Sequence, residues 1–349
     1  MKYSLIITIS CLAILSCKKE KIEENQNSSE YNNGILVLNE GLFQQNNASL
    51  SWIDLSSNEV TNQIFLSTNN RPLGDTGNDM DVYGGKLYIV VNASSTVEVL
   101  DKRSLKSIKQ VQLQYDGQGQ QPRSIAFHLG KAYITSYDGY VNILDTTSLI
   151  ITNRIQVGQN PEGLGVYGND LFVSNSGGLS FPDVDSTVFK IDLFTHQVTD
   201  TFVVGNNPGD LVCDDQGDVY VVKRGDYSEN DPSELIRIDQ NGDVEQTGIH
   251  ASTLTKNDHQ LYISYYNYNS GQGNVSVFDL ENEILLNNGL INSSEVETLY
   301  GFTFHMNKGY ACDAMNFTNS GYIKSFDEFG DIDQSYHVGL NPTKIIYYD

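Results

Sequence analysis

Seven aspartates recur through the chain at nearly constant intervals, and carboxylates spaced in this way could either bind cations or close turns. Each ends a short apolar segment such as "SWID", "EVLD" or "SVFD", and the set is Asp54, Asp101, Asp145, Asp192, Asp239, Asp279 and Asp327. The intervals are 47, 44, 47, 47, 40 and 48 residues. A carboxylate at the end of a strand can accept hydrogen bonds from the next backbone amides as an Asx turn. We therefore expect a structural role for these aspartates and no metal site.

The aspartates belong to a longer repeat that sets where every other side chain can lie. Upstream of each aspartate stands a segment such as "KLYIVVN" or "DVYVVKR", with a shared column of Leu36, Tyr88, Tyr133, Phe172, Tyr220, Tyr262 and Tyr310. The short runs alternate apolar and polar residues and are separated by Gly, Asn and Asp, which is the pattern of strands and turns. Intervals of about 40–50 residues are typical of one four-stranded propeller blade.

The two ends of the chain complete this pattern. Within one repeat the order is strand A ("PEGLGVYG"), strand B ("DLFVSNS"), strand C ("STVFKID") and strand D ("QVTDTFVV"). The final "NPTKIIYYD" is a strand A with nothing after it, whereas "GILVLNE" near residue 34 is a strand B without its A. Joining them in one blade closes the ring and removes exposed sheet edges. We predict an all-β, seven-bladed β-propeller over residues 34–349.

Antiparallel blades place the A-to-B and C-to-D turns on one face and the B-to-C and D-to-A connections on the other. The histidines test for an enzyme. Five of the six fall in A-to-B turns, in a C-to-D turn or within a strand, namely His128, His196, His259, His305 and His337, and His250 alone reaches a D-to-A connection. A lyase or lactonase would need a histidine, or a metal held by converging side chains, on the second face. We expect a protein that is not an enzyme.

The second face carries long, polar and aromatic loops, including "NSGGLSFPDVDS", "YYNYNSGQGN" and "DAMNFTNSGY". Five of its D-to-A connections, "NNRPLGD", "GQQPRSI", "QNPEGLG", "NNPGDL" and "GLNPTKI", share a proline, which favours an extended backbone there. The charged residues beside these prolines should ring the mouth of the central channel: Arg71, Arg123, Glu162 and Lys344. Aromatic rings and amides suit a bulky, partly apolar ligand with many neutral polar groups. The predicted pool of contacts is Asn39, Glu40, Arg71, Arg123, Tyr137, Asn175, Arg224, Tyr265, Tyr266 and Tyr300.

The N-terminus has the features of an exported lipoprotein. Residues 1–16, "MKYSLIITISCLAILS", contain an apolar run that is too short to span a bilayer and is typical of a secretory signal. The following "ILSC" resembles the bacterial lipobox, so we expect Cys17 to carry the lipid anchor; the alternative is a plain cleaved signal. Residues 17–33 then form a flexible tether, because Ile22 is the one aliphatic residue among residues 18–33.

Charge and cysteine content narrow the possible partners. The chain has 21 basic and 44 acidic side chains and a net charge of −23, which repels the phosphate backbone of nucleic acids. Cys213 and Cys312 fall in repeats that are not neighbours, so we expect buried thiols rather than a disulfide. No pattern of cysteines and histidines suggests zinc, and no cofactor is predicted.

Several stretches resemble a known family. "GILVLNEGLFQQNNASLSWIDLSSNEVTNQIF", "RPLGDTGNDMDVYGGKLYIVVNAS", "PRSIAF", "KAYITSYDG" and "IQVGQNPEGL" are similar to YncE-like propeller surface lipoproteins of Bacteroidetes, of the DUF5074 type, whose best-understood members are the BtuG-type cobalamin-capture lipoproteins. The resemblance covers the propeller from about residue 34 and is strongest over the first four blades. It implies an outer-membrane protein, anchored by lipid and exposed on the cell surface, that binds a corrinoid and passes it to a TonB-dependent transporter.

Three hypotheses follow for the function. The first is a non-enzymatic capture lipoprotein that binds its ligand, such as a corrinoid, in a rigid, pre-formed site. The second is a propeller that binds a protein or a glycan at the cell surface through a flat, wide face. The third, a metal-dependent lyase or lactonase, requires carboxylates that converge on the second face.

Overall fold

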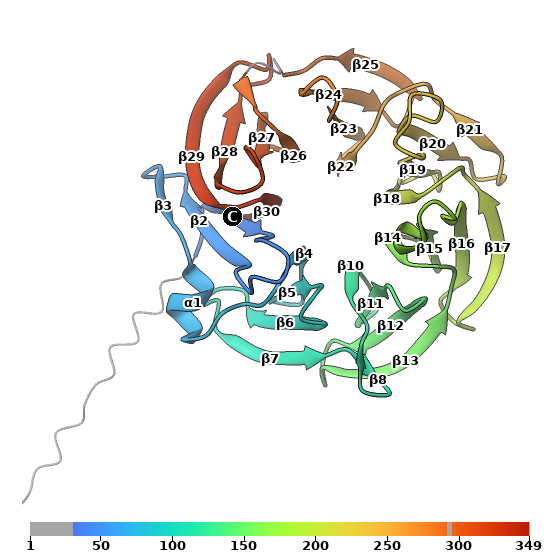
Figure 1. The fold of residues 1–349 in the computed structure, drawn as a ribbon, viewed down its shortest axis with the longest axis horizontal. Helices are drawn as coiled ribbons and strands as arrows, with labels where there is room; N and C mark the ends of the chain where they lie inside the picture. Colours follow the sequence, from blue (N-terminus) through green and yellow to red (C-terminus); the bar gives the residue numbers. More distant parts are fainter. Residues whose placement is uncertain (1–30, 292–294, 349) are drawn as a thin grey trace, which may run out of the picture.

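The computed structural model describes residues 31–291 and 295–348. Within these ranges the chain forms seven antiparallel four-stranded sheets arranged around a central axis (Figure 1). The predicted seven-bladed propeller is confirmed. In each blade, strand A lies innermost and strand D outermost, and we number the blades 1 to 7 from the one that holds the N-terminal strand.

The first four blades have the following strands, from the inside outward. Blade 1 contains β30 (Pro342–Tyr348), β1 (Gly34–Asn39), β2 (Ser49–Asp54) and β3 (Glu59–Thr61); blade 2 contains β4 (Gly77–Tyr83), β5 (Lys86–Val91), β6 (Thr96–Asp101) and β7 (Ser107–Gln112). Blade 3 contains β10 (Pro122–His128), β11 (Lys131–Ser136), β12 (Tyr140–Asp145) and β13 (Ile150–Gln156); blade 4 contains β14 (Pro161–Tyr167), β15 (Asp170–Asn175), β16 (Thr187–Asp192) and β17 (Gln197–Val203).

The last three blades follow the same order. Blade 5 contains β18 (Pro208–Cys213), β19 (Val219–Lys223), β20 (Glu234–Ile238) and β21 (Val244–Gln246); blade 6 contains β22 (Thr253–Asn257), β23 (Gln260–Asn267), β24 (Gln272–Asp279) and β25 (Ile284–Asn288). Blade 7 contains β26 (Leu299–His305), β27 (Lys308–Asp313), β28 (Ser320–Phe326) and β29 (Ile332–Leu340). The connections hold a short hairpin of β8 (Gln114–Tyr115) and β9 (Gln118–Gly119), a helix α1 (Ile64–Asn69) and a 3-10 turn η1 (Gly178–Ser180).

Ring closure occurs in blade 1, where the two ends of the domain meet. Strand β30 pairs antiparallel with β1 from Gly34 opposite Tyr348 to Leu38 opposite Lys344. The ring of Tyr348 also packs edge-on against Trp52 of β2, with centroids 5.5 Å apart. The prediction that both termini complete one blade is therefore confirmed.

The repeated column of strand B forms the core between blades. Its seven side chains, Leu36, Tyr88, Tyr133, Phe172, Tyr220, Tyr262 and Tyr310, are each at most 5% exposed. In one inter-blade cluster, Tyr88 of blade 2 packs with Ile134 and Leu144 of blade 3. Because each sheet packs face to face with the next, the ring is a rigid scaffold for its loops.

The seven repeated aspartates close turns, as predicted. In every blade the aspartate Oδ1 accepts a hydrogen bond from the backbone N–H two residues later, and the donors are Ser56, Arg103, Thr147, Phe194, Asn241, Glu281 and Phe329. These carboxylates are thus engaged by the backbone of the C-to-D turns.

The propeller makes contacts slightly before the predicted domain boundary. Tyr31, placed by the sequence in the tether, donates its backbone N–H to the carbonyl of Arg103 at 3.2 Å and packs edge-on against Trp52 at 5.1 Å. The predicted signal peptide and Cys17 lie outside the described residues. Within the described part of the chain, no helix is long and apolar enough to cross a membrane. Cys213 is a half-buried free thiol and Cys312 a buried one.

Candidate ligand-binding face

The two faces of the ring differ in the connections that they carry. We call the side of the A-to-B and C-to-D turns the turn face, and the side of the B-to-C loops and D-to-A connectors the loop face. The histidines are distributed as predicted: His250 lies in the connector before β22, and the others lie at turn-face ends of strands, in turn-face turns or, for His337, within β29. Every residue of the predicted contact pool lies near the loop-face end of a strand or in a loop-face connection.

The mouth of the channel is built by one repeated position, the second residue of strand A. In blades 2, 3, 4, 5 and 7 this position holds Asn78, Arg123, Glu162, Gly209 and Tyr300. In blades 3 to 5 the preceding residue is the proline that starts the strand, so the backbone enters each strand in a similar extended form. The sequence repeat thereby delivers different side chains to equivalent places around the axis.

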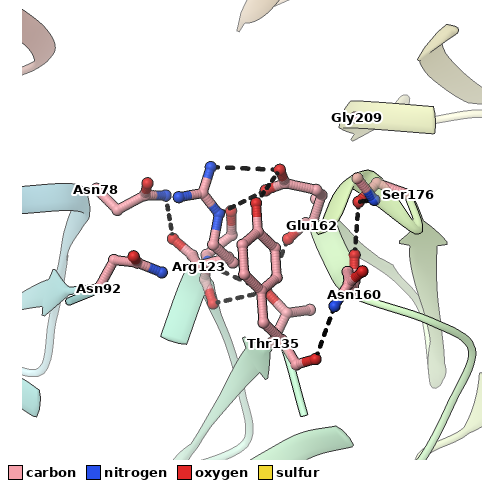
Figure 2. Close-up of polar contacts among 12 residues, drawn as sticks. Asn78, Asn92, Arg123, Thr135, Asn160, Glu162, Ser176 and Gly209 are labelled. Carbon is pink, nitrogen blue, oxygen red and sulfur yellow. Dashed lines mark hydrogen bonds and ion pairs between the residues drawn. The ribbon is translucent and has the colours of Figure 1, made fainter. Parts of the chain in front are cut away.

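Three blades meet in one cluster of charged side chains at this mouth. The Glu162 carboxylate accepts hydrogen bonds from Arg123 Nε at 2.7 Å, from Arg224 Nη1 at 3.0 Å and from the Tyr137 hydroxyl at 2.7 Å. The Arg123 guanidinium also lies over the Tyr137 ring, 4.9 Å from its centroid. Figure 2 shows Arg123 between Asn78 and Glu162, and Asn78 donates to its backbone carbonyl at 2.5 Å. We call Arg123, Tyr137, Glu162 and Arg224 the arginine–glutamate cluster.

Burial and charge together fix the protonation of this cluster. The side chain of Glu162 is 6% exposed, against 19% for Arg123 and 30% for Arg224. Burial alone would raise the pKa of Glu162, but the two guanidiniums and the Tyr137 hydroxyl outweigh it and lower the pKa to about 2. Burial also raises the pKa of Tyr137, which stays a neutral hydrogen-bond donor. The cluster is therefore a fixed arrangement of charges at neutral pH.

Arg224 reaches this cluster because its neighbour is a glycine. A Cβ atom on Gly209 would lie 2.6 Å from both Cζ and Nε of Arg224, so the guanidinium rests directly on the backbone of β18. Arg224 itself follows β19, and its backbone N–H donates to the carbonyl of Asn207. Blade 5 has a glycine at the mouth position, and Arg224 from the β19–β20 loop of the same blade fills the space that a side chain would take.

A cavity of about 390 Å³ opens at the mouth, where Asn78, Arg123, Glu162 and Arg224 line it, and continues between deeper residues of the innermost strands. Lys344 of β30 lies in this cavity and forms an ion pair with Asp79 of β4 at 3.1 Å. Asp79 and Asp210 also accept backbone N–H groups of the following blade, those of Ile125 at 3.0 Å and Leu254 at 2.8 Å. Lys344, predicted at the mouth, therefore lies one residue deeper, where it neutralises carboxylates that tie blades together.

On the other side of the mouth stands a second acid. Glu40, which follows β1, accepts the hydroxyl of Tyr300 at 2.6 Å. Burial raises the pKa of Glu40 above its usual value, against the lowering effects of the Tyr300 hydroxyl and the Arg123 charge. Glu40 and Glu162 therefore differ: one carboxyl is shifted toward its neutral form and the other is held ionised.

Aromatic side chains surround these polar groups from blade 4 to blade 7. Tyr300 packs edge-on against Phe317 with centroids 5.3 Å apart, Phe317 stacks with Tyr268 at 6.4 Å, and Tyr268 packs against Tyr266 at 4.9 Å. Further along, Phe181 and Tyr227 lie 6.2 Å apart. We call Phe181, Tyr227, Tyr266, Tyr268, Phe317 and Tyr300 the aromatic arc. Tyr227 and Tyr268 are each 69% exposed, so the arc offers apolar surface to a ligand.

Two of the predicted contacts are framework residues. Asn39 and Asn175 are fully buried at the ends of strands β1 and β15. The Asn39 amide donates to the hydroxyl of Ser51 at 2.9 Å, and the Asn175 amide donates to the hydroxyl of Thr187 at 3.1 Å. Their side chains therefore bind strand C of their own blades rather than face the loop side. Tyr265 instead stacks on His250, with ring centroids 4.9 Å apart.

Arg71 does not ring the mouth, contrary to the prediction. Helix α1 lengthens the connector between blades 1 and 2, so Pro72 precedes β4 by several residues instead of starting it. Arg71 lies over the ring of Phe65 and forms an ion pair with the buried Glu98 of β6 at 2.7 Å. The inserted helix moves this arginine outward along blade 2, and Asn78 occupies the equivalent place at the mouth.

The predicted contact pool also omits residues that the structure places at the site: Phe181, Tyr227, Tyr268 and Phe317 of the arc, together with Gly209. The four aromatic residues all stand inside the long B-to-C loops, so their position in the repeat was the signal that could have found them. Gly209 is the second residue of its strand A, like Arg123 and Glu162, so aligning the repeats could have placed it at the mouth. Across the described ranges, no group of three His, Cys, Asp or Glu side chains could hold a metal ion.

The comparisons with known proteins agree with this architecture. The model of a domain of unknown function, DUF5074, matches residues 33–326. The chain belongs to the DUF5074 family. No curated protein matches it.

Solved structures show the same fold at low sequence identity. A quinonprotein alcohol dehydrogenase-like protein from Bacteroides thetaiotaomicron VPI-5482 is 13% identical with a TM-score of 0.66, and the match covers 93% of this chain and 79% of that one. Hydrazine synthase from Kuenenia stuttgartiensis is 16% identical with a TM-score of 0.60, covering 74% and 85%. At such identities the likeness of this DUF5074 protein to them concerns the fold alone.

Proposed function

We propose that this DUF5074 protein is a capture lipoprotein that binds a bulky, partly apolar ligand, with a corrinoid as the candidate, across its loop face. The single observation that carries the proposal is the aromatic arc beside the arginine–glutamate cluster. The rings offer apolar contact area, and the guanidiniums and Glu40 offer hydrogen-bond donors and an acceptor. Such a mixed surface suits a large ligand rimmed by amides.

The shape of the loop face supports a small-molecule ligand over a flat protein partner. The axial cavity of about 390 Å³ falls in the range of ligand pockets, about 300–1,000 Å³. The side chains around it are held by ion pairs and ring contacts, so little ordering would accompany binding. A flat, wide face for a protein partner would lack this hollow.

The delivery part of the proposal rests on the N-terminal sequence and the resemblance. Lipidation at Cys17 would hold the protein at the outer membrane, exposed on the cell surface, and the residues between Cys17 and Tyr31 would link this anchor to the propeller. The captured ligand would then pass to a TonB-dependent transporter in the same membrane. The propeller would act by binding rather than by chemistry: among the histidines of the described chain, His250 alone stands in a loop-face connector, and its ring is stacked on Tyr265.

Calorimetric titration tests the ligand directly. Residues 31–349, which contain every strand of the seven blades, would be titrated with cyanocobalamin and with its truncated analogue cobinamide. Tight one-to-one binding is the expected result. The absence of heat at high micromolar ligand would reject the corrinoid and leave the fold and the proposed anchor untouched.

Replacing Tyr227 and Tyr268 together with serine is expected to weaken corrinoid binding by at least about tenfold, because two exposed rings of the arc are lost; tenfold equals about 1.4 kcal/mol. The melting temperature should hardly change, since both rings are 69% exposed. Phe194→Ser is the matched control, because Phe194 is 73% exposed on the turn face. Equal losses of affinity in the control would show that the arc is not the binding surface.

Gly209→Ala probes the cluster without removing any of its side chains. The added methyl group must displace the guanidinium of Arg224 from its place beside Glu162. We expect corrinoid affinity to fall severalfold, while the free energy of unfolding changes by less than about 1 kcal/mol because Arg224 is partly exposed. Calorimetry and urea unfolding measure the two effects. Gly289→Ala is the control, since its added Cβ would meet its nearest neighbour at an ordinary 3.8 Å.

A further inference from the structure

A second hollow, of about 770 Å³, opens on the loop face between blades 3 and 4. Its walls are the β11–β12 turn with the first residue of β12 (residues 137–140), the end of β13 with the connector to blade 4 (residues 156–160), and the B-to-C loop of blade 4 at residues 180 and 183–186. We call it the blade 3–4 groove. Tyr137 lines this groove and also donates to Glu162, so the groove adjoins the mouth without being part of it.

The groove is polar, and its charged side chains are acidic, which disfavours an anionic ligand. Its lining contains three aspartates and neither lysine nor arginine. Two of the aspartates are already committed: Asp138 accepts Gln120 Nε2 and an Arg154 guanidinium nitrogen, and Asp185 accepts the backbone N–H groups of Gln159 and Thr187. Asp183 differs, because no donor among the described residues contacts its carboxylate.

Two side-chain amides in the groove are also available to a ligand. Gln156 at the end of β13 and Gln159 in the connector that follows are both exposed, and within the described chain neither side-chain amide has a hydrogen-bond partner. Each amide offers an NH₂ donor and a carbonyl acceptor, whereas the Asp183 carboxylate offers acceptors alone. Adjacent hydroxyl groups on one ring need this combination, because each hydroxyl both donates and accepts.

The groove also has apolar contact surface held in a fixed position. Arg154 lies over the ring of Tyr140, 3.8 Å from its centroid, and Arg123 lies over the ring of Tyr137 at 4.9 Å. Each tyrosine that lines the groove is therefore held in position by a guanidinium packed on its ring. A rigid ring beside free amides and a free carboxylate can pack against the C–H surface of a sugar while its hydroxyls are bound.

We propose that the blade 3–4 groove binds a neutral sugar, as a free saccharide or as a residue of a glycan. A metal ion fits less well, because no described group of three acidic, histidine or cysteine side chains could hold one, and the amide NH₂ groups would have no role. An organic cation would use Asp183 but not the two amide donors. The groove would bind its sugar whichever ligand occupies the mouth.

Saturation-transfer NMR on the purified protein tests the groove with a mixture of glucose, galactose, mannose and N-acetylglucosamine. At about 10 mM of each sugar the method detects dissociation constants in the millimolar range. We expect transfer to at least one sugar, and we expect Asp183→Ala and Gln159→Ala each to reduce it at least fivefold. Asp200→Ala and Gln197→Ala on β17 are the matched controls, exposed on the outer strand of the same blade.

Two outcomes would overturn the proposal: no transfer to any of the four sugars, or equal loss in the β17 control variants. If no sugar shows transfer, a parallel measurement with putrescine would show whether the groove binds an organic cation instead. Corrinoid titration of Asp183→Ala separates this site from the mouth, because its corrinoid affinity should equal that of the unaltered protein.

Discussion

Glu162→Ala is expected to lower the free energy of unfolding by about 3–5 kcal/mol, the usual cost of removing one partner from a buried ion pair. The carboxylate is 6% exposed and receives hydrogen bonds from Arg123, Arg224 and Tyr137, so its loss leaves two guanidiniums without their anion. Ligand binding at the mouth should be lost as well, because both arginines are positioned by Glu162. Urea unfolding and corrinoid titration measure the two effects.

Glu245→Ala provides the matched control for this experiment. Glu245 also pairs with an arginine, Arg237, at 3.2 Å, but its side chain is 70% exposed. Exposed pairs contribute about 0–1 kcal/mol, so this variant should remain close to the unaltered protein. If the free energy of unfolding fell equally in both variants, the ion pairs of Glu162 would contribute no more than an exposed pair, and the cluster would not act as a buried unit.

The pH dependence gives an independent check on Glu162. Its pKa falls from 4.5 in the unfolded chain to about 2 in the folded protein, so ionisation stabilises the fold. This contribution is complete above the unfolded pKa of 4.5 and is lost as the pH falls through about 2. The difference in stability between the unaltered protein and Glu162→Gln should therefore be constant from neutral pH to about pH 5 and shrink below that.

The repeat made the framework predictable from sequence. The strand-B column and the aspartate each occur once per blade, so their spacing gave the number of blades and the position of the Asx turns. The unpaired strands at the two ends of the chain predicted the ring closure. The periodicity also identifies which strand ends point to the loop face. These features depend on local backbone patterns, which the sequence repeats seven times.

The site was predictable only in part, because side-chain direction is not carried by the repeat. Asn39 and Asn175 end strands at the loop face, yet both turn inward to bond strand C. Arg71 and Arg123 both stand beside a proline, but helix α1 displaces Arg71 toward Glu98. The convergence of Arg123 and Arg224 on Glu162 joins three blades, and such contacts depend on the closed ring rather than on any one repeat.

Ending the chain at Asn341 is expected to abolish cooperative unfolding, because the missing strand β30 is the seal of the ring. Tyr348 is 1% exposed, and β30 also supplies Ile345, Ile346 and Tyr347 to the packing around blade 1. Full burial of one such side chain contributes about 1.5–3 kcal/mol, against a total stability of about 5–15 kcal/mol for a typical domain. Differential scanning calorimetry would show the loss of the unfolding transition.

The truncated chain also exposes the edge of β1, which is apolar from Ile35 to Leu38 and normally paired with β30. Such an edge recruits other strands, so we expect concentration-dependent association in size-exclusion chromatography. A synthetic peptide of residues 341–349 should occupy the edge and restore a monomeric protein with a cooperative transition.

Replacing the β8–β9 hairpin, residues 114–119, with two glycines is the control, since this hairpin lies outside the seven sheets and both of its strands are exposed. If the truncated chain stayed monomeric and melted like the unaltered protein, the ring would owe its stability to the packing between blades rather than to its seal.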